Sequence, residues 1–361
     1  MFVKLSQIIN FTIKKMKKAS LLINIIMLIS ISTSFSQAIH SGYRIADKIH
    51  LEGDGGWDYL TMDDSNSRLY ISHGTICQVL DVNEKKVAGT IPDTKGIHGI
   101  ALARELNKGF TSNGRDTSVT VFDLKTLQVI TKIKVTGSNP DAILYDPFSH
   151  KVFTFNGRSS NSTVIDANTN QVIGTIVLPG KPEFSVTDGK GKVFVNIEDK
   201  SLVCRINPVT LKVEKTWPIA PGEEPSGLAI DSKDHRLFIV CGNKLMIVLD
   251  ADNGNVVSKL DIGERVDGVA YDPALKRVYS SNGDGTMTVV QEENKDTFKV
   301  IENFATQKGA RTIAVNPRTH RIYLPVAEYE TAPAATTDNP HPRPAVKANS
   351  FMILEIEPIL K

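Results

Sequence analysis

One polar position recurs along this chain at intervals of about 42 residues. It is occupied by Asp58, His98, Asp141, Glu183, Ser226, Asp267 and Arg311. If the fold gathers these residues, the carboxylates will repel one another unless a cation, shared protons or the arginine balances their charge. The chemistry open to the group therefore depends on the elements that position it.

Two kinds of chemistry would follow from such a gathering. Oxygen-rich sites suit Ca²⁺ or Mg²⁺, and the imidazole of His98 would also admit Zn²⁺. The predicted ligands of this divalent cation are Asp58, Asp141, Glu183 and Asp267. The catalytic candidates are His98 and Asp141 as acid and base, with Arg311 stabilising negative charge. The alternative is a water-filled channel that polar side chains merely line.

The spacing comes from a repeated β-hairpin unit. The segment RVYSSNGDGTMTVV, residues 277–290, has two runs of β-forming residues around an Asn-Gly-Asp-Gly turn. Similar units begin at Gly55, Gly96, Asn139, Lys181, Glu224, Arg265 and Gly309. Each unit predicts four antiparallel strands, with a short Asp capping the turn between the third and the fourth. These capping residues are Asp81, Asp123, Asp166 and Asp250.

The two ends of the chain complete one another. The last unit has a third strand at residues 350–355 but no fourth, and residues 43–53 match the missing strand. Their pairing would close a ring and remove a free sheet edge. We therefore predict an all-β fold, a seven-bladed β-propeller with four-stranded antiparallel blades, formed as one domain by residues 39–361. Closure would place the recurring polar position around one axial funnel.

The second and third strands of the units resemble a known repeat family. Their pattern, R-V-Y-x-S-N-G followed by V-x-V-x-D, is similar to the YVTN-type propeller repeats of bacterial surface and periplasmic proteins. The resemblance covers nearly all of the chain after its N-terminal segment and implies the propeller fold. It implies no single activity, because related secreted propellers include lactonase-like, lyase-like and redox-partner proteins.

The loops on the funnel face vary more than the turns on the opposite face, so we expect function on the funnel face. Two neighbouring units carry near-duplicate Asn-Gly-Arg loops, whose arginines are either grips for a carboxylate or phosphate or solvated turn residues. Trp57 is a candidate for stacking on a sugar or for packing between blades. The predicted ligand-binding residues are Trp57, His98, Asn113, Arg115, Asn156, Arg158, Arg311 and Tyr329.

The last unit contains a long insertion between its second and third strands. Its sequence, YETAPAATTDNPHPRPAVKAN, covers residues 329–349 and is rich in Pro, which excludes regular strand pairing. By topology it emerges on the funnel face. The insertion is predicted to be a lid or a partner-binding arm, with Glu328, Tyr329, His341 and Arg343 as contacts, or else a passive loop.

Residues 1–36 have the pattern of a secretory signal peptide. Four lysines at positions 14–18 precede a short apolar run and a small polar segment ending at Ser36, with Met16 as an alternative start. The apolar run is short for a bilayer span, and so we predict a periplasmic or secreted protein with no membrane span in the mature chain.

Composition narrows the choice of partners. The 42 Lys and Arg include five in residues 1–36, so that 37 face 40 Asp and Glu in the mature chain, a net charge of −3. This charge and the 7% of aromatic residues disfavour nucleic-acid binding. Cys77, Cys204 and Cys241 show no CxxC spacing and are expected as buried thiols, a Cys204–Cys241 pair being the alternative.

Two functional hypotheses remain. The first is a monomeric binding protein that presents its polar funnel and Pro-rich loop to a small polar ligand, a glycan or a protein partner. The second is a metal-assisted lactonase-like hydrolase or lyase that uses the same funnel. The sequence has no nucleophile elbow, HExxH, EF-hand or P-loop motif, which favours the binding protein.

Overall fold

The structure is a computed structural model of the 361-residue chain, and it describes residues 42–53, 55–334, 336, 342 and 344–359. The predicted signal peptide lies outside these residues and stays a prediction. Among the described residues, no helix has the length and apolar character needed to cross a bilayer.

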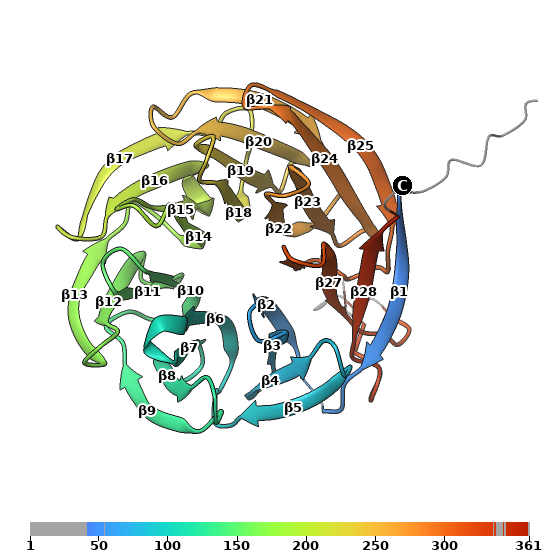
Figure 1. The fold of residues 1–361 in the computed structure, drawn as a ribbon, viewed down its shortest axis with the longest axis horizontal. Coiled ribbons are helices and arrows are strands. Elements are labelled where there is room, and N and C mark those ends of the chain that lie inside the picture. The colour runs from blue at the N-terminus through green and yellow to red at the C-terminus, as the bar shows by residue number, and fades with distance from the viewer. Residues whose placement is uncertain (1–41, 54, 335, 337–341, 343, 360–361) are drawn as a thin grey trace, which may run out of the picture. The chain divides into compact units, whose positions relative to one another are not determined.

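Seven four-stranded antiparallel sheets surround a common axis, which confirms the predicted propeller (Figure 1). Blade 1 contains β2 (Trp57–Asp63), β3 (Arg68–His73), β4 (Ile76–Asp81) and β5 (Lys86–Ile91). Blade 2 contains β6 (Ile97–Ala103), β7 (Lys108–Asn113), β8 (Ser118–Asp123) and β9 (Val129–Lys134). Blade 3 contains β10 (Pro140–Asp146), β11 (Lys151–Asn156), β12 (Asn161–Asp166) and β13 (Gln171–Val177).

The remaining blades repeat this order from the axis outward. Blade 4 contains β14 (Pro182–Thr187), β15 (Val193–Ile197), β16 (Leu202–Asn207) and β17 (Lys212–Pro218). Blade 5 contains β18 (Pro225–Asp231), β19 (Arg236–Cys241), β20 (Leu245–Asp250) and β21 (Val256–Asp261). Blade 6 contains β22 (Val266–Asp272), β23 (Arg277–Asn282), β24 (Thr286–Asn294) and β25 (Thr297–Ala305). Two short 3₁₀ helices, Arg104–Leu106 and Glu198–Lys200, interrupt loops of blades 2 and 4.

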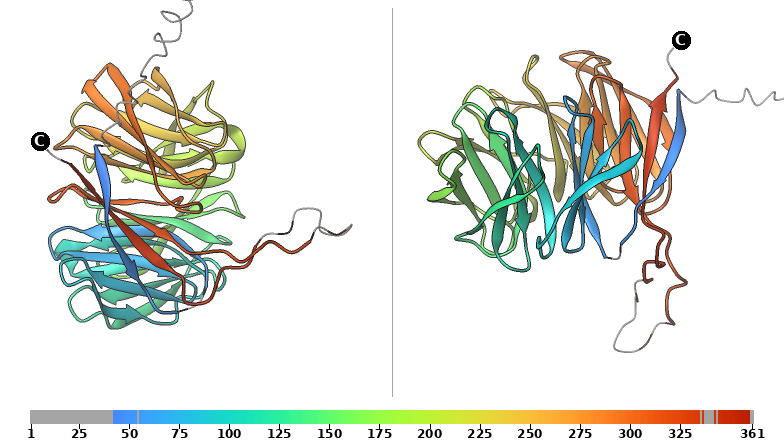
Figure 2. Two further views of the ribbon diagram at one scale, coloured as in Figure 1. Left: turned by 90° about the vertical axis from the view of Figure 1, so that its right-hand side faces the viewer. Right: turned by 60° about the horizontal axis from the view of Figure 1, so that its bottom comes forward.

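Blade 7 joins the two ends of the described chain, as predicted. It contains β26 (Ala314–Asn316), β27 (Arg321–Val326), β28 (Met352–Pro358) and, as its outermost strand, β1 (Tyr43–His50). The register of β1 on β28 runs from Tyr43 opposite Pro358 to His50 opposite Met352. Figure 2 shows the two strands side by side at the edge of the ring.

Burial explains the different sequence patterns of the four strands. The second and third strands are sandwiched between neighbouring blades, and so strands such as β19, RLFIVC, are buried along their whole length. The outermost strands alternate, as in β13, because only one of their faces is covered. Cys77, Cys204 and Cys241 are all buried and free, and burial raises the pKa of each thiol to about 12.

Side-chain caps fix the turns between the third and fourth strands. Oδ1 of Asp81 accepts hydrogen bonds from the backbone N–H groups of Asn83 and Glu84, at 2.9 and 3.0 Å. The same two-bond cap recurs at Asp123, Asp166 and Asp250, which confirms the predicted turn chemistry.

The described parts of the insertion in blade 7 project outward from the ring (Figure 2). Its two stems are joined by a bridge between Tyr329 and Val346 and by the hydrogen bond from Glu330 N to Ala345 O at 2.8 Å. The described stem residues, 328–334 and 344–349, are all exposed. His341 and Arg343 lie outside the described residues.

Candidate functional site

The recurring polar residues stand where the innermost strands begin. Six of them occupy the second position of their strands: Asp58, His98, Asp141, Glu183, Ser226 and Asp267. Arg311 precedes β26. The ring of blades turns this sequence position into one polar group at the mouth of the axis, which we call the funnel group.

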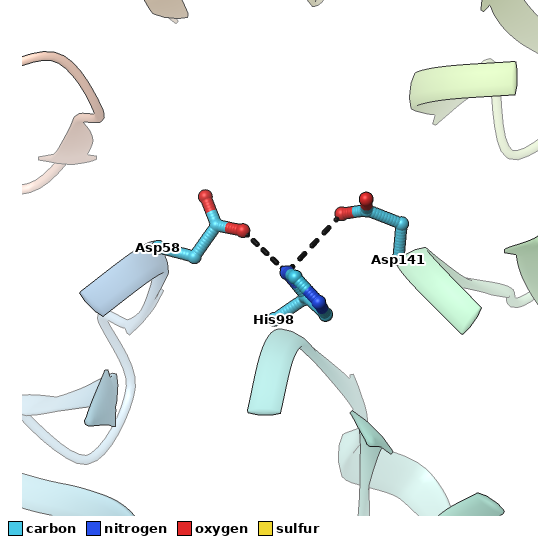
Figure 3. A group of neighbouring side chains, drawn as sticks. All are labelled: Asp58, His98 and Asp141. Carbon is cyan, nitrogen blue, oxygen red and sulfur yellow. Dashed lines mark hydrogen bonds and ion pairs between the residues drawn. The ribbon is translucent and has the colours of Figure 1, made fainter. Parts of the chain in front are cut away.

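The funnel group is centred on one imidazole shared by two carboxylates. His98 Nδ1 lies 2.6 Å from Asp58 Oδ2 and 3.5 Å from Asp141 Oδ1, with the three side chains coming from blades 1, 2 and 3 (Figure 3). Because Nδ1 faces two acceptors, it carries a hydrogen, and in the neutral imidazole Nε2 is then the proton acceptor. The exposed fraction of the side chain is 16% for Asp58, 28% for His98 and 15% for Asp141, so that a small molecule can reach all three.

The other two carboxylates of the funnel group already have cationic partners. Glu183 Oε1 lies 2.7 Å from Lys181 Nζ, and Asp267 forms an ion pair with Arg311. Lys181 was not among the predicted site residues, although its position two residues before Glu183 was the available signal. The predicted four-carboxylate cation site is therefore divided, and only Asp58 and Asp141 share a site with His98.

Burial and mutual repulsion shift the protonation of the funnel group. Burial raises the pKa of Asp141 to about 6, against the charge of His98, which lowers it. Burial and then the charge of Asp141 raise the pKa of Glu183 to about 7, against the Lys181 ion pair. Burial alone would lower the pKa of His98, but the Asp58 hydrogen bond and the nearby carboxylates outweigh it and raise the pKa above 6.5. The group thus holds protons that free side chains would release near neutral pH.

The axis is filled one residue further along the innermost strands. Five blades contribute small residues there, and the other two contribute Tyr59 and Phe184. These rings meet edge to face, with centroids 5.0 Å apart, although they come from blades 1 and 4. The cavity that remains around them is about 20 Å³, room for about one water molecule. The two rings therefore narrow the axis at this level, where the alternative of a water-filled channel would need an open passage.

Gly114, in the loop between the second and third strands of blade 2, lies directly against the Nε2 side of the His98 ring. A Cβ on Gly114 would lie 2.7 Å from His98 Nε2 and 2.9 Å from Asn139 Oδ1. The equivalent Gly157 in blade 3 is free of this constraint, since its Cβ would meet nothing closer than 3.7 Å. The near-duplicate loops thus offer a matched pair of positions.

We expect Gly114→Ala to displace the His98 imidazole and Gly157→Ala to leave it in place. Displacement breaks the Asp58 hydrogen bond, so the pKa of His98 should fall in Gly114→Ala, because that bond raises it. Titration of the imidazole by NMR measures the effect directly. Equal His98 pKa values in the two variants would contradict this account of the loop.

The asparagines of the same loops are structural and do not reach the funnel. Asn113 is fully buried, and its Nδ2 donates to Ser118 Oγ at 3.1 Å and Thr120 Oγ1 at 2.9 Å. Asn156 repeats the arrangement with Asn161 and Thr163. Both amides are thus occupied by their own hairpins, which is the physical reason to remove them from the predicted ligand-binding set.

The other predicted contacts surround the funnel group. Arg115 and Arg158 are exposed, and neither side chain takes part in an ion pair with the described residues. Trp57 packs against Phe351, with ring centroids 5.1 Å apart, and against Tyr329, at 6.5 Å. Trp57 therefore packs at the junction of blades 1 and 7, whereas Tyr329 is 43% exposed at the base of the insertion.

Comparison with known proteins supports the fold and goes no further. No family model matches this chain, and no curated protein matches it. Among solved structures, a chain of hydrazine synthase from Kuenenia stuttgartiensis is similar, with a TM-score of 0.66 and 16% sequence identity. The alignment covers 83% of this chain and 98% of that chain. Identity at this level shows a shared propeller fold alone.

Proposed function

We propose that this protein binds a small ligand carrying amine and hydroxyl groups at the mouth of its funnel. The observation that carries the proposal is the imidazole of His98 between the carboxylates of Asp58 and Asp141. At a pH above about 7, where Asp141 and Glu183 are ionised, the funnel group has four carboxylates against Lys181 and Arg311 and so carries an excess of negative charge. An ammonium group would offset that excess, and hydroxyl groups would share the oxygen-rich surface.

The narrowed axis supports a binding pocket rather than a passage. Tyr59 and Phe184 give the funnel an aromatic floor on which a sugar ring could stack. Arg115 and Arg158 at the rim would accept an acidic substituent on the same ligand. An amino sugar or a short glycan that contains one combines these features.

The test is calorimetric titration with glucosamine, glucose and spermidine on the wild type and on Asp58→Asn. We expect binding of the two amines and not of glucose, and at least a tenfold loss of affinity in Asp58→Asn, because a charge-assisted hydrogen bond is lost. The control is Asp252→Asn, an exposed carboxylate in a turn on the opposite face. Amine binding that survives unchanged in Asp58→Asn, or no binding of either amine, would reject the proposal.

A second candidate function is a metal-assisted lactonase-like hydrolase or lyase. It is favoured by one observation: a ligand atom from each of Asp58, His98 and Asp141 lies within 4.8 Å of the others, a mixed nitrogen and oxygen set that suits Zn²⁺ as well as Mg²⁺ or Ca²⁺. A bound ion would supply Lewis-acid polarisation of a carbonyl. Bound through Nδ1, the His98 imidazole would carry its hydrogen on Nε2 and would act as a ligand, and Arg311 would stabilise developing negative charge.

We rank this candidate second, because Asp58 and His98 are already joined by a direct hydrogen bond that an ion would have to replace. Metal content by mass spectrometry of protein purified without chelator separates the two candidates. One divalent ion per chain in the wild type and none in His98→Gln would support the enzyme.

We further propose that the protein is a YVTN-type propeller, exported to the periplasm or beyond, and that it acts as a monomer. The repeat pattern supports the family assignment, and the pattern of residues 1–36 supports export. The projecting stem at 328–334 and 344–349 supports a partner-binding arm better than a lid, because its described residues extend away from the ring.

A further inference from the structure

A second group of carboxylates lies between blades 5 and 6, at the end of the axis opposite the funnel. Asp231 ends β18, Asp234 lies in the turn that follows, and Glu292 belongs to β24. One carboxylate oxygen from each residue lies within 4.8 Å of those of the other two. Asp231 is only 4% exposed and Glu292 only 1%. Buried carboxylates in such proximity require a compensating positive charge or a bound proton.

Glu292 departs from the repeat at a position that is otherwise apolar. Its backbone N–H donates to Lys276 O, as Ala167 N–H donates to His150 O and Ala251 N–H to His235 O in other blades. These shared bonds establish which residues are equivalent. At this position the other six blades have Val82, Leu124, Ala167, Pro208, Ala251 and Pro358. A buried carboxylate here is not needed to build a blade.

The protein supplies too few protons and cations for this group. The hydroxyl of Tyr271 lies 2.5 Å from Glu292 Oε2 and 3.2 Å from Asp231 Oδ2, but it has one hydrogen for the two acceptors. Glu292 Oε1 is buried and has no hydrogen-bond partner among the described residues. Among the described residues, the cation within ion-pair distance of the group is Lys276, whose Nζ lies 3.7 Å from Asp234 Oδ2. One ammonium group faces three carboxylates.

Two of the equivalent aspartates in other blades have a basic partner within the protein. Asp63 Oδ1 pairs with Arg104 Nε at 2.9 Å, and Asp272 Oδ2 pairs with His320 Nδ1 at 2.7 Å. At Asp231 the corresponding partner is Tyr271, which brings no charge and is shared with a second carboxylate. Asp146, the equivalent residue of blade 3, instead accepts hydrogen bonds from the hydroxyls of Ser149 and Thr187, both at 2.6 Å. Among the described residues, Asp231 has neither a basic partner nor a hydroxyl that serves it alone.

We propose that Asp231, Asp234 and Glu292 bind a Ca²⁺ ion that joins blades 5 and 6. The donor set contains oxygen alone, which suits a hard cation and not Zn²⁺. Ligand oxygens at 2.3–2.6 Å from Ca²⁺ are separated by at most about 4.6–5.2 Å, and the spacing within 4.8 Å fits that limit. Asp231 Oδ1 also accepts the backbone N–H of Lys233 at 2.8 Å, which orients the carboxylate. Glu292 Oε1 would gain the partner it lacks.

The test uses the whole chain, stripped with EDTA and titrated with CaCl₂ to about 10 mM, above the ~10⁻⁴–10⁻³ M dissociation constants of extracellular calcium modules. Calorimetry should give one ion per chain, and the melting temperature should rise by a few degrees. Glu292→Ala, which installs the residue of blades 3 and 5, should fold and lose the response. Glu293→Ala changes the exposed neighbouring glutamate and should keep it.

Further measurements distinguish Ca²⁺ binding at this site from binding at the funnel group, and distinguish Ca²⁺ from other ions. Asp58→Asn should respond to Ca²⁺ as the wild type does, and MgCl₂ should give a weaker response because Mg²⁺ demands a tighter octahedron. No Ca²⁺ response in the wild type, or a full response in Glu292→Ala, overturns the proposal. A response lost in Asp58→Asn and kept in Glu292→Ala would place the ion in the funnel and also overturn it. If Glu292→Ala misfolds, Glu292→Gln decides by the same criteria.

Discussion

A chain that begins at Glu52 instead of Gly42 will not form a stable closed ring. The shorter chain lacks β1, and with it the buried side chains of Tyr43, Ile49 and Leu51. Burial of three such side chains contributes about 1.5–3 kcal/mol each, and the strand ladder on β28 is lost as well. This loss is comparable to the whole net stability of a typical domain, about 5–15 kcal/mol.

The effect should be specific to the closing strand. Loss of β1 also exposes β28, whose Ile353, Leu354 and Ile356 are fully buried in the closed ring, and an uncovered apolar edge of this kind promotes aggregation. The measurement is the soluble yield and the thermal unfolding transition of chains that begin at Gly42 and at Glu52. The chain from Gly42 is expected to be monomeric and to unfold cooperatively. Equal melting temperatures for the two chains would show that blade 7 is stable with three strands.

The free energy of unfolding of the ligand-free protein will fall as the pH rises from about 5 to about 8, unlike that of most proteins. Asp141 changes from an unfolded pKa of 3.8 to about 6 in the folded state, and Glu183 from 4.5 to about 7. The pKa of His98 is also raised, from 6.5. Folded protein therefore binds more protons than unfolded protein across this range, and proton release destabilises the fold.

Asp141→Asn should remove much of this pH dependence. One pKa unit corresponds to about 1.4 kcal/mol, so that Asp141 alone accounts for on the order of 2–3 kcal/mol between the two limits. The substitution also removes the charge that helps to raise the pKa of Glu183 and of His98. Urea unfolding at about pH 5 and about pH 8 gives the difference for each protein. Asp252→Asn, on the opposite face, should keep the wild-type slope, and a wild-type protein more stable at the higher pH would refute the assignment.

The fold could be predicted from the sequence because a repeat repeats its strands, its turns and its caps together. The Asp caps at positions such as Asp81 and Asp166 mark the same turn in successive units, and the N-terminal segment supplied the strand that the last unit lacked. Each local signal agreed with the global architecture, which is the condition under which pattern alone specifies a fold.

The site was predictable only as a gathering of residues. Repeat spacing brings Asp58, His98 and Asp141 to one axis, but which side chains pair depends on rotamers and on the angle between blades. Lys181 was missed for that reason, because it stands outside the recurring position and reaches Glu183 by its long side chain. Asn113 was predicted to contact a ligand at the rim of the funnel. The register of its strand instead directs its side chain toward Ser118 and Thr120 of the same hairpin.

The carboxylate group of blades 5 and 6 carried a signal that alignment of the units could have found. Gln291 and Glu292 stand where four of the other units have an Asp cap followed by an apolar residue. The partner residues come from a different blade, however, and only the packing of β18 and its turn against β24 places Asp231 and Asp234 beside Glu292. Contacts between repeats are the part of a propeller that the period itself does not encode.

Tyr59 and Phe184 meet across the axis and narrow it below the funnel group, beside a cavity of about 20 Å³. A molecule bound beside His98 would therefore enter and leave through the same mouth, on the funnel face of the propeller. A partner that covers this mouth would lengthen the residence time of the bound ligand without contacting the ligand. Attachment of another molecule to the opposite face of the propeller would leave ligand entry and release unchanged.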